Sequence, residues 1–257
     1  MDALLHKRLD FYETYLVEYH RAMGCVVTVL HPFVLFRNDE IDVPWYNYAG
    51  IVPWSDMPGR ARICEVMAYY RAQGCAPFFR FTIETAPEGC AAALQAAGCM
   101  LACERHVMFQ REPIGPPVPA GVRLGETGPH DLQAAGRILR ISFGSDGPVS
   151  HEPELHGRLV ARMRAARVRQ LGAWLDGQLA AVVHMHTLGG VGRITGMATA
   201  PAFRGRGLAG LLTAYAARCA RDDGAVFVAL EVATPEAERV YARIGFSRAA
   251  ERVGYSA

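Results

Sequence analysis

A strand that runs into a glycine- and arginine-rich turn and then into an apolar helix restricts the fold of this chain more than any other feature. It occupies residues 194–212, ITGMATAPAFRGRGLAGLL. Backbone N–H groups at a helix N-terminus have no partner inside the helix and lie at the positive end of its dipole, so such a turn binds anions. Arg204 and Arg206 add charge-assisted donors for phosphate oxygens. The segment therefore predicts a site for a pyrophosphate group in an α/β protein.

Two phosphate-binding interpretations compete for this segment. Gly205, Gly207 and Gly210 fit the G-x-G-x-x-G pattern of dinucleotide-binding folds, and Glu231 lies about twenty residues further on, where a ribose-binding acid would sit. That fold places the glycine turn directly after its first strand and needs several further strand–helix units. Here a connection containing Pro201 intervenes and fewer than 50 residues follow. The context therefore disfavours a nicotinamide or flavin enzyme.

The surrounding sequence alternates apolar runs with amphipathic stretches and turn signals. We expect strands near residues 122–126, 169–175, 179–186, 192–199 and 226–233, and helices near 130–142, 154–165, 205–224 and from Pro235 onward. Asp176-Gly177 between two apolar runs is a hairpin signal, so the central strands should be antiparallel. These elements predict an α/β (mixed α+β) fold in which helices flank a mostly antiparallel mixed sheet.

A proline-rich segment divides the chain into two halves. Four prolines fall within PIGPPVPA, residues 113–120, where neither a helix nor a central strand can continue because proline lacks a backbone donor. We therefore expect domains at 1–112 and 121–257 joined by this linker. A weak internal repeat supports two copies of one fold, because each half contains a helix, a strand, a helix with a proline in its first turn (Pro87, Pro235) and a final strand.

Charge and composition exclude several classes of partner. The 27 basic and 25 acidic residues give a formal charge of +2, which argues against binding to nucleic acid or to a membrane surface. Residues 1–24 read as an amphipathic helix and no apolar run approaches the ~20 residues that span a bilayer. Seven cysteines in apolar contexts suit reduced thiols, and their spacing lacks the pairs of a zinc site. We expect a cytoplasmic protein with no metal.

Two motifs in order resemble the GCN5-related N-acetyltransferase (GNAT) family. Arg204, Gly207 and Ala209 form the R-x-x-G-x-A pattern of its cofactor turn, and residues 230–246, LEVATPEAERVYARIGF, are similar to its next strand and helix. The resemblance covers most of residues 121–257. It implies a tandem of two GNAT-like domains, in which the first is a degenerate copy that serves as a structural unit or as a wall of the acceptor site.

The resemblance also implies acetyl-CoA as cosubstrate, held between two splayed neighbouring strands. Met197, Ala198 and Thr199 would bind the pantetheine arm through their backbone. Tyr241 would contact the cofactor and protonate the leaving thiolate, which is within the chemistry of a phenol. The pyrophosphate would be wrapped by the turn and the helix start: Arg204, Gly205, Arg206, Gly207, Leu208 and Ala209.

An attacking ammonium must lose a proton, and Glu231 matches the position at which some family members keep a catalytic glutamate. Its side chain could instead face solvent, since strand neighbours alternate. His184 and His186, on one face of an earlier strand, are alternative bases or substrate contacts. Phe143 and Asp146, between the two helices that shape the family's acceptor site, are further candidates for substrate binding. Thr234 stands where many members have an asparagine.

Taken together, the residues predict an N-acetyltransferase that transfers an acetyl group from acetyl-CoA directly to a primary amine, with a small molecule favoured over a protein as acceptor. The alternative is a non-catalytic module that senses acyl-CoA. No residue identifies the acceptor, and the sequence leaves open whether the protein is a monomer or a homodimer.

Overall fold

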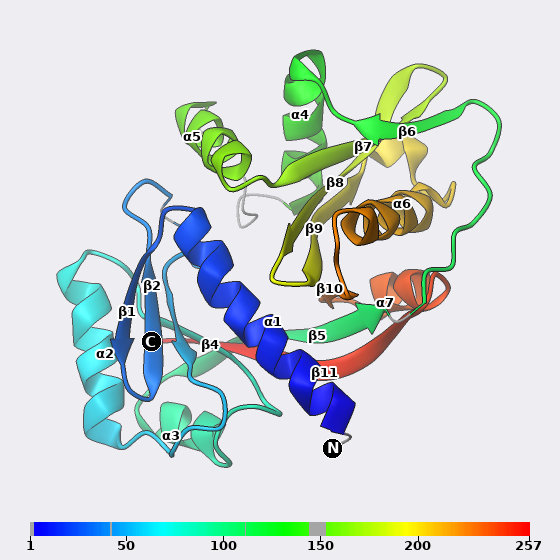
Figure 1. Ribbon diagram of the computed structural model, residues 1–257. Coiled ribbons are helices and arrows are strands. Elements are labelled where there is room, and N and C mark those ends of the chain that lie inside the picture. Colours follow the sequence, from blue (N-terminus) through cyan, green and yellow to red (C-terminus); the bar gives the residue numbers. More distant parts are fainter. Residues whose placement is uncertain (1–2, 42, 111, 144–152) are drawn as a thin grey trace. The chain divides into compact units, whose positions relative to one another are not determined.

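The computed structural model describes residues 3–41, 43–110, 112–143 and 153–257, and its chain folds into two compact units (Figure 1). Unit 1 comprises Met1–Val107 and Ala249–Ala257, and unit 2 comprises Met108–Arg248. The boundaries fall inside two long strands, β5 (Met100–Gln110) and β11 (Phe246–Ser256). Each unit therefore contains part of both strands.

This division differs from the expected domains 1–112 and 121–257. Residues 113–120 lie within unit 2, as the connection between β5 and β6 (Val122–Glu126). Residues 249–257 belong to unit 1 because β11 pairs antiparallel with β4 (Phe78–Thr82), from Arg252 opposite Thr82 to Ser256 opposite Phe78. The prolines do interrupt secondary structure, but strand pairing, which a local sequence signal does not report, sets the units.

Unit 1 is a sheet covered by helices. Its strand order is β1-β2-β3-β4-β11-β5, with β1 (Val26–Leu30), β2 (Phe33–Arg37) and β3 (Tyr48–Ile51) at one side. Helices α2 (Arg60–Ala72) and α3 (Cys90–Ala96) bury Tyr70 and Leu94 against Phe79 of β4. Helix α1 (Ala3–Ala22) contributes Val17 to a second cluster with Tyr48 and Phe78.

The repeated order of elements expected from the sequence is present. Unit 1 contains α2, β4, α3 and β5, and the second half contains α6 (Leu208–Asp222), β10 (Phe227–Val232), α7 (Pro235–Ala242) and β11. Pro235 occupies the first position of α7, as expected. The expectation for Pro87 is wrong, because α3 begins only at Cys90, after Gly89 takes a left-handed φ of 81° as its N-cap. That the first copy is a degenerate GNAT domain stays a prediction.

Unit 2 contains a mixed sheet of order β10-β9-β8-β7-β6, with β7 (Arg169–Leu175), β8 (Gln178–Leu188) and β9 (Val191–Thr199). The pairs β6–β7, β7–β8 and β8–β9 are antiparallel, whereas β9 and β10 are parallel. The predicted hairpin at Asp176-Gly177 and the antiparallel central strands are therefore confirmed. Two-residue loops close both hairpins: Asp176-Gly177 joins β7 to β8, and Gly189-Gly190 joins β8 to β9. All four residues have a left-handed φ.

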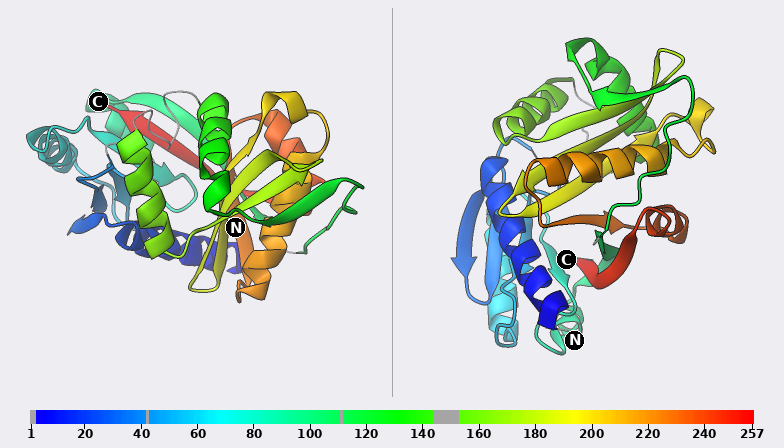
Figure 2. Two further views of the ribbon diagram at one scale, coloured as in Figure 1. Left: turned by 90° about the horizontal axis from the view of Figure 1, so that it is seen from above. Right: turned by 45° about the vertical axis from the view of Figure 1, so that its right-hand side comes forward.

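Helices cover both faces of this sheet. Figures 1 and 2 show α6 on one side of it, and α4 (Leu132–Phe143) and α5 (Pro153–Ala165) on the other. On the α6 face, Met185, Ile194 and Leu230 join the main apolar core of the unit. On the opposite face, Val182 and Ala198 pack in a smaller cluster that includes residues of α4. Within the described ranges, every helix is too short or too polar to cross a membrane.

A buried ion pair in unit 1 yields a stability prediction. Arg252 Nη1 lies 2.9 Å from Glu13 Oε1, with side chains only 2% and 11% exposed. Arg252→Ala should lower the free energy of unfolding by about 3 kcal/mol, because it leaves a buried carboxylate without its partner charge. Arg21→Ala breaks the half-exposed Arg21–Glu18 pair of α1 and should cost less than about 1 kcal/mol. Urea denaturation of both variants tests this, and equal losses would contradict it.

Candidate active site

Strands β9 and β10 lie side by side over only part of their length. Their parallel register runs from Val191 opposite Phe227 to Ile194 opposite Leu230, whereas β9 continues to Thr199 and β10 to Val232. On its other edge, β9 remains paired with β8 as far as Thr199. The two strands therefore part after Ile194 and Leu230, which is the splayed pair that the resemblance implies. We call the β10-facing side of residues 195–199, which lies beyond the last pair with β10, the open edge of β9.

A β-bulge in β9 lies at the start of this open edge. Val182 of β8 pairs with Ala198 and His184 pairs with Thr195, so that two residues of β9, Gly196 and Met197, stand opposite one residue of β8. Gly196 has a φ of 62°, and a Cβ there would lie 2.7 Å from His184 Nδ1. Glycine alone adopts this left-handed φ without strain and also leaves room for the His184 ring. The extra residue bends the strand and changes the direction of its backbone groups, over the segment expected to hold a pantetheine arm.

The turn after β9 exposes the predicted anion site. A short 3₁₀ helix (Pro201–Phe203) leads to Arg204, and α6 begins at Leu208, which is buried and anchors the helix. Gly205 and Gly207 take left-handed φ values of 76° and 75°, and a Cβ on either would meet no atom within 4 Å. The two glycines are therefore required by backbone conformation, and the space above them is open.

The arginines of the turn differ in their contacts. Arg204 Nε donates a hydrogen bond to the carbonyl oxygen of Thr199 at 3.2 Å, which ties the turn to the end of β9. The Arg206 guanidinium lies 5.9 Å from the centre of the Phe203 ring and is exposed. The structure thus brings the predicted residues 197–199 and 204–209 together in one continuous path, from the open strand edge to the helix N-terminus with its outward N–H groups.

Tyr241 lies on α7 and packs against the apolar core of unit 2. Its ring centre is 6.2 Å from that of Phe246, and burial raises the pKa of Tyr241 to about 12. The phenol is therefore protonated at neutral pH, as a proton donor must be.

Thr234, in the place of the family's asparagine, acts as the N-cap of α7 by accepting a hydrogen bond from the Ala237 N–H at 3.3 Å.

Glu231 is the first residue of β10 beyond its last pair with β9. Its side chain is 8% exposed, and its Oε1 lies 3.5 Å from Arg193 Nη2 of β9. Glu231 therefore does not point into solvent, the alternative that the sequence left open. Sequence reasoning missed Arg193, whose only signal was a charged residue within an apolar strand.

The two histidines lie on the same face of β8 and are buried. His184 Nε2 is 2.9 Å from Gln170 Nε2 on β7. Burial lowers the pKa of His186 to about 4; a hydrogen bond with the Ala166 backbone opposes this shift, and the positive charge of Arg193 adds to it. His186 is consequently neutral at pH 7.

Of the other predicted substrate contacts, Phe143 ends α4 with its ring partly exposed, and Asp146 lies outside the described residues.

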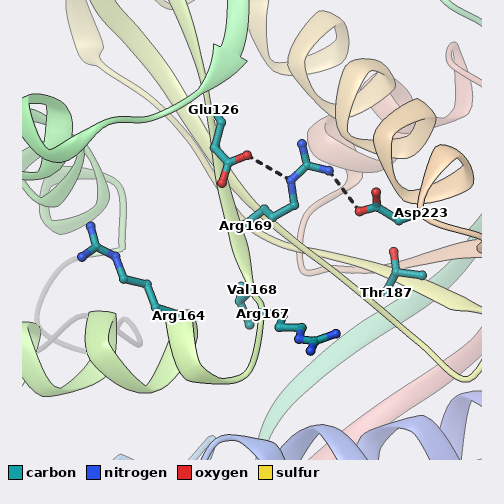
Figure 3. A pocket seen from close by; sticks show the side chains of 7 residues that line it. All are labelled: Glu126, Arg164, Arg167, Val168, Arg169, Thr187 and Asp223. Atoms are coloured by element: carbon teal, nitrogen blue, oxygen red, sulfur yellow. Dashed lines mark hydrogen bonds and ion pairs between the residues drawn. The ribbon is translucent and has the colours of Figure 1, made fainter.

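A separate pocket of about 430 Å³ lies at the other end of β9, where Thr187 of β8 pairs with Gly192. Figure 3 shows Arg169 between Glu126 and Asp223, at 3.2 Å and 3.0 Å. The sequence did not predict this pocket because its lining comes from several elements that are distant along the chain.

Within the described part of the chain, no group of three or more histidine, cysteine or acidic residues is placed to hold a metal ion.

Comparisons with known proteins agree with this geometry. The sequence pattern of the acetyltransferase (GNAT) family matches residues 134–246. A GCN5-related N-acetyltransferase from Kribbella flavida has a similar structure, with 21% identity, a TM-score of 0.76 and coverage of 95% of this chain and 94% of that chain. A tandem GNAT protein from the clavulanic acid biosynthesis pathway has 16% identity, a TM-score of 0.63 and coverage of 88% and 78%. These two likenesses show the fold. No curated protein matches the chain.

The buried His186 predicts how stability depends on pH. Its pKa is 6.5 in an unfolded chain and about 4 in the folded protein, so the unfolded state binds a proton first as the pH falls. His186 should therefore lower the stability progressively between pH 6.5 and 4, by up to about 3 kcal/mol. The His186→Asn variant lacks this term and should lose less stability than the wild type between pH 7 and 4.5. Urea denaturation at both pH values measures the difference, and identical losses would contradict the assignment.

Proposed function

We propose that the protein transfers an acetyl group from acetyl-CoA to a primary amine of a small-molecule acceptor, because residues 134–246 match the pattern of the acetyltransferase (GNAT) family. The observation that carries the proposal is the continuous path from the open edge of β9 to the exposed glycine turn. Acyl-CoA-dependent acetyl transfer is the general chemistry of the family. The amine acceptor and the roles of individual residues are our proposal.

The cofactor would use both parts of that path. Its pyrophosphate would accept hydrogen bonds from the N–H groups of residues 205–209, where Gly205 and Gly207 let it approach, with Arg204 and Arg206 adding positive charge. Its pantetheine arm would then pair with the backbone of Met197, Ala198 and Thr199 in place of the missing strand partner. Such pairing satisfies backbone groups that β10 leaves open.

The reaction needs two proton movements. The acceptor ammonium loses one proton to Glu231, and the free amine attacks the thioester carbonyl carbon. A C–N bond forms and the C–S bond breaks. The leaving sulfur takes the proton of the Tyr241 phenol, and the second proton of the acetylated nitrogen restores the phenol. The products are the acetamide, the CoA thiol and one proton that passes from Glu231 to water.

The residues fit these roles unequally. The Tyr241 phenol is protonated at neutral pH and packs against the apolar core, so it has a proton to donate to the leaving thiolate. Glu231 lies at the fork between β9 and β10, where the thioester would end. His186 is a weaker candidate for the base, because it lies on β8, one strand away from the fork between β9 and β10.

Calorimetric titration with acetyl-CoA, followed by thiol-release assays across a panel of amines, tests the proposal. We expect binding and the release of CoA thiol with some amines. Binding without turnover on any amine would favour the alternative of an acyl-CoA sensor. An absence of binding would overturn the cofactor site itself.

A pair of glycine variants tests the phosphate turn. Gly207 and Gly177 have φ values of 75° and 81°, and a Cβ on either meets no atom within 4 Å. Gly207→Ala and Gly177→Ala should each destabilise the fold by about 1 kcal/mol. Only Gly207→Ala should weaken acetyl-CoA binding, by about tenfold or more, because its methyl group occupies the space of the phosphate. Calorimetry decides, and equal affinities in the two variants would contradict the proposed turn.

Two tyrosine variants test the proton donor. Tyr241→Phe should lower kcat by about 100-fold or more, the usual contribution of a general acid, while the affinity for acetyl-CoA changes little. Tyr215→Phe is the matched control, because Tyr215 also packs at the margin of the same core but lies on α6, outside the proposed site. Steady-state thiol release compares them, and an equal kcat for Tyr241→Phe and the control would rule out the acid role.

A further inference from the structure

A buried pair of opposite charges lies where β9 and β10 part. Arg193 stands opposite Ala229 in the parallel register, and Glu231 follows Leu230, the last paired residue of β10. Arg193 Nη2 and Glu231 Oε1 are 3.5 Å apart. Under the proposed function, the acetyl group and the acceptor amine meet at this fork. The pair is therefore at the reacting end of the site.

Stability gives no adequate reason for this pair. The side chains of Arg193 and Glu231 are 10% and 8% exposed, and removing two charges from water costs several kcal/mol per ion. A contact of 3.5 Å is long for a charge-assisted hydrogen bond, which is usually near 2.8 Å. In other proteins, apolar side chains in place of a buried ion pair have often served the fold equally well or better. The charges are therefore better explained by binding than by folding.

The pair faces the side of the sheet that carries α4. Arg193 lies directly opposite His186 of β8, so their side chains share a face. The neighbouring residues Ile194 and Leu230 point to the other face, into the core beneath α6. Since His186 is neutral at pH 7, Arg193 and Glu231 are the charged members of these three side chains.

We propose that the acceptor is an α-amino acid, whose ammonium group contacts Glu231 and whose carboxylate contacts Arg193. This inference rests on the proposed function and names its substrate class. The two protein charges are close together, and an α-amino acid carries its own two charges on a single carbon. A bound zwitterion therefore places each charge beside an opposite one while the contact between Arg193 and Glu231 persists. Polyamines and amino sugars offer no anion for the buried guanidinium.

Matched acceptors test the inference. Thiol release is measured with the proteinogenic L-amino acids, their carboxamides and their decarboxylated amines, each with saturating acetyl-CoA. For the best amino acid, kcat/KM should exceed that of its carboxamide and of its decarboxylated amine by about 100-fold or more, because a site built around a carboxylate rejects analogues that lack it.

Variants separate recognition from folding. Arg193→Gln should reduce the preference for the carboxylate to less than about tenfold, and Arg193→Lys should restore part of it because the charge remains. Arg169→Gln is the control, since Arg169 also forms ion pairs in this sheet but belongs to the other pocket. It should keep the wild-type preference. Circular dichroism and acetyl-CoA titration of each variant confirm that it is folded.

The outcomes separate the two proposals. If the wild type acetylates amines without a carboxylate as efficiently as amino acids, the inference is overturned and the acetyltransferase function stands. An unchanged preference in folded Arg193→Gln overturns it equally. A failure of the wild type to bind acetyl-CoA overturns the proposed function and this inference together. If Arg193→Gln does not fold, the wild-type preference and the Arg193→Lys variant still decide.

Discussion

Parallel pairing between β9 and β10 stops after four residue pairs, and this break places each group of the candidate site. Backbone N–H and carbonyl groups beyond the break need other partners, which a bound ligand can supply. The bulge at Gly196 belongs to the same segment and turns its backbone outward. The strand then ends in the turn that begins α6, and β10 carries Glu231 to the point of separation. A fully paired β9 would leave no room for a ligand between the strands.

Burial decides which groups are charged around this break. It raises the pKa of the Tyr241 phenol and lowers that of the His186 imidazole, so the phenol stays neutral well above pH 7 and the imidazole well below it. The remaining charges fall into two sets with different surroundings. Arg204 and Arg206 are exposed on the turn, where they can attract a phosphate from solution, whereas Arg193 and Glu231 are buried as a pair. The first set is accessible from solution, and the second is largely shielded from water by the residues around it.

Local signals predicted much of unit 2 and little of the relations between distant residues. Asp176-Gly177 fixed a hairpin, and the glycine turn fixed the start of α6, because each depends on a few neighbouring residues. The pairing of Arg193 with Glu231 spans 38 residues and that of Arg252 with Glu13 spans 239, so no local pattern reports them. The same reason explains the domain boundaries. Prolines mark where a strand cannot continue, but they do not tell which sheet the following strands join.

The strand β11 has a consequence for how the protein is made. Residues 249–257 complete the sheet of unit 1 by pairing with β4, and they follow all of unit 2 in the chain. A ribosome adds roughly 5–20 residues per second, so unit 1 waits on the order of ten seconds, while unit 2 is synthesised, before its sheet can close. During that interval β4 presents an unpaired edge with apolar side chains such as Phe79 and Phe81, which are buried in the finished protein. The pairing of β11 with β4 is therefore the last strand pairing that synthesis makes available to unit 1.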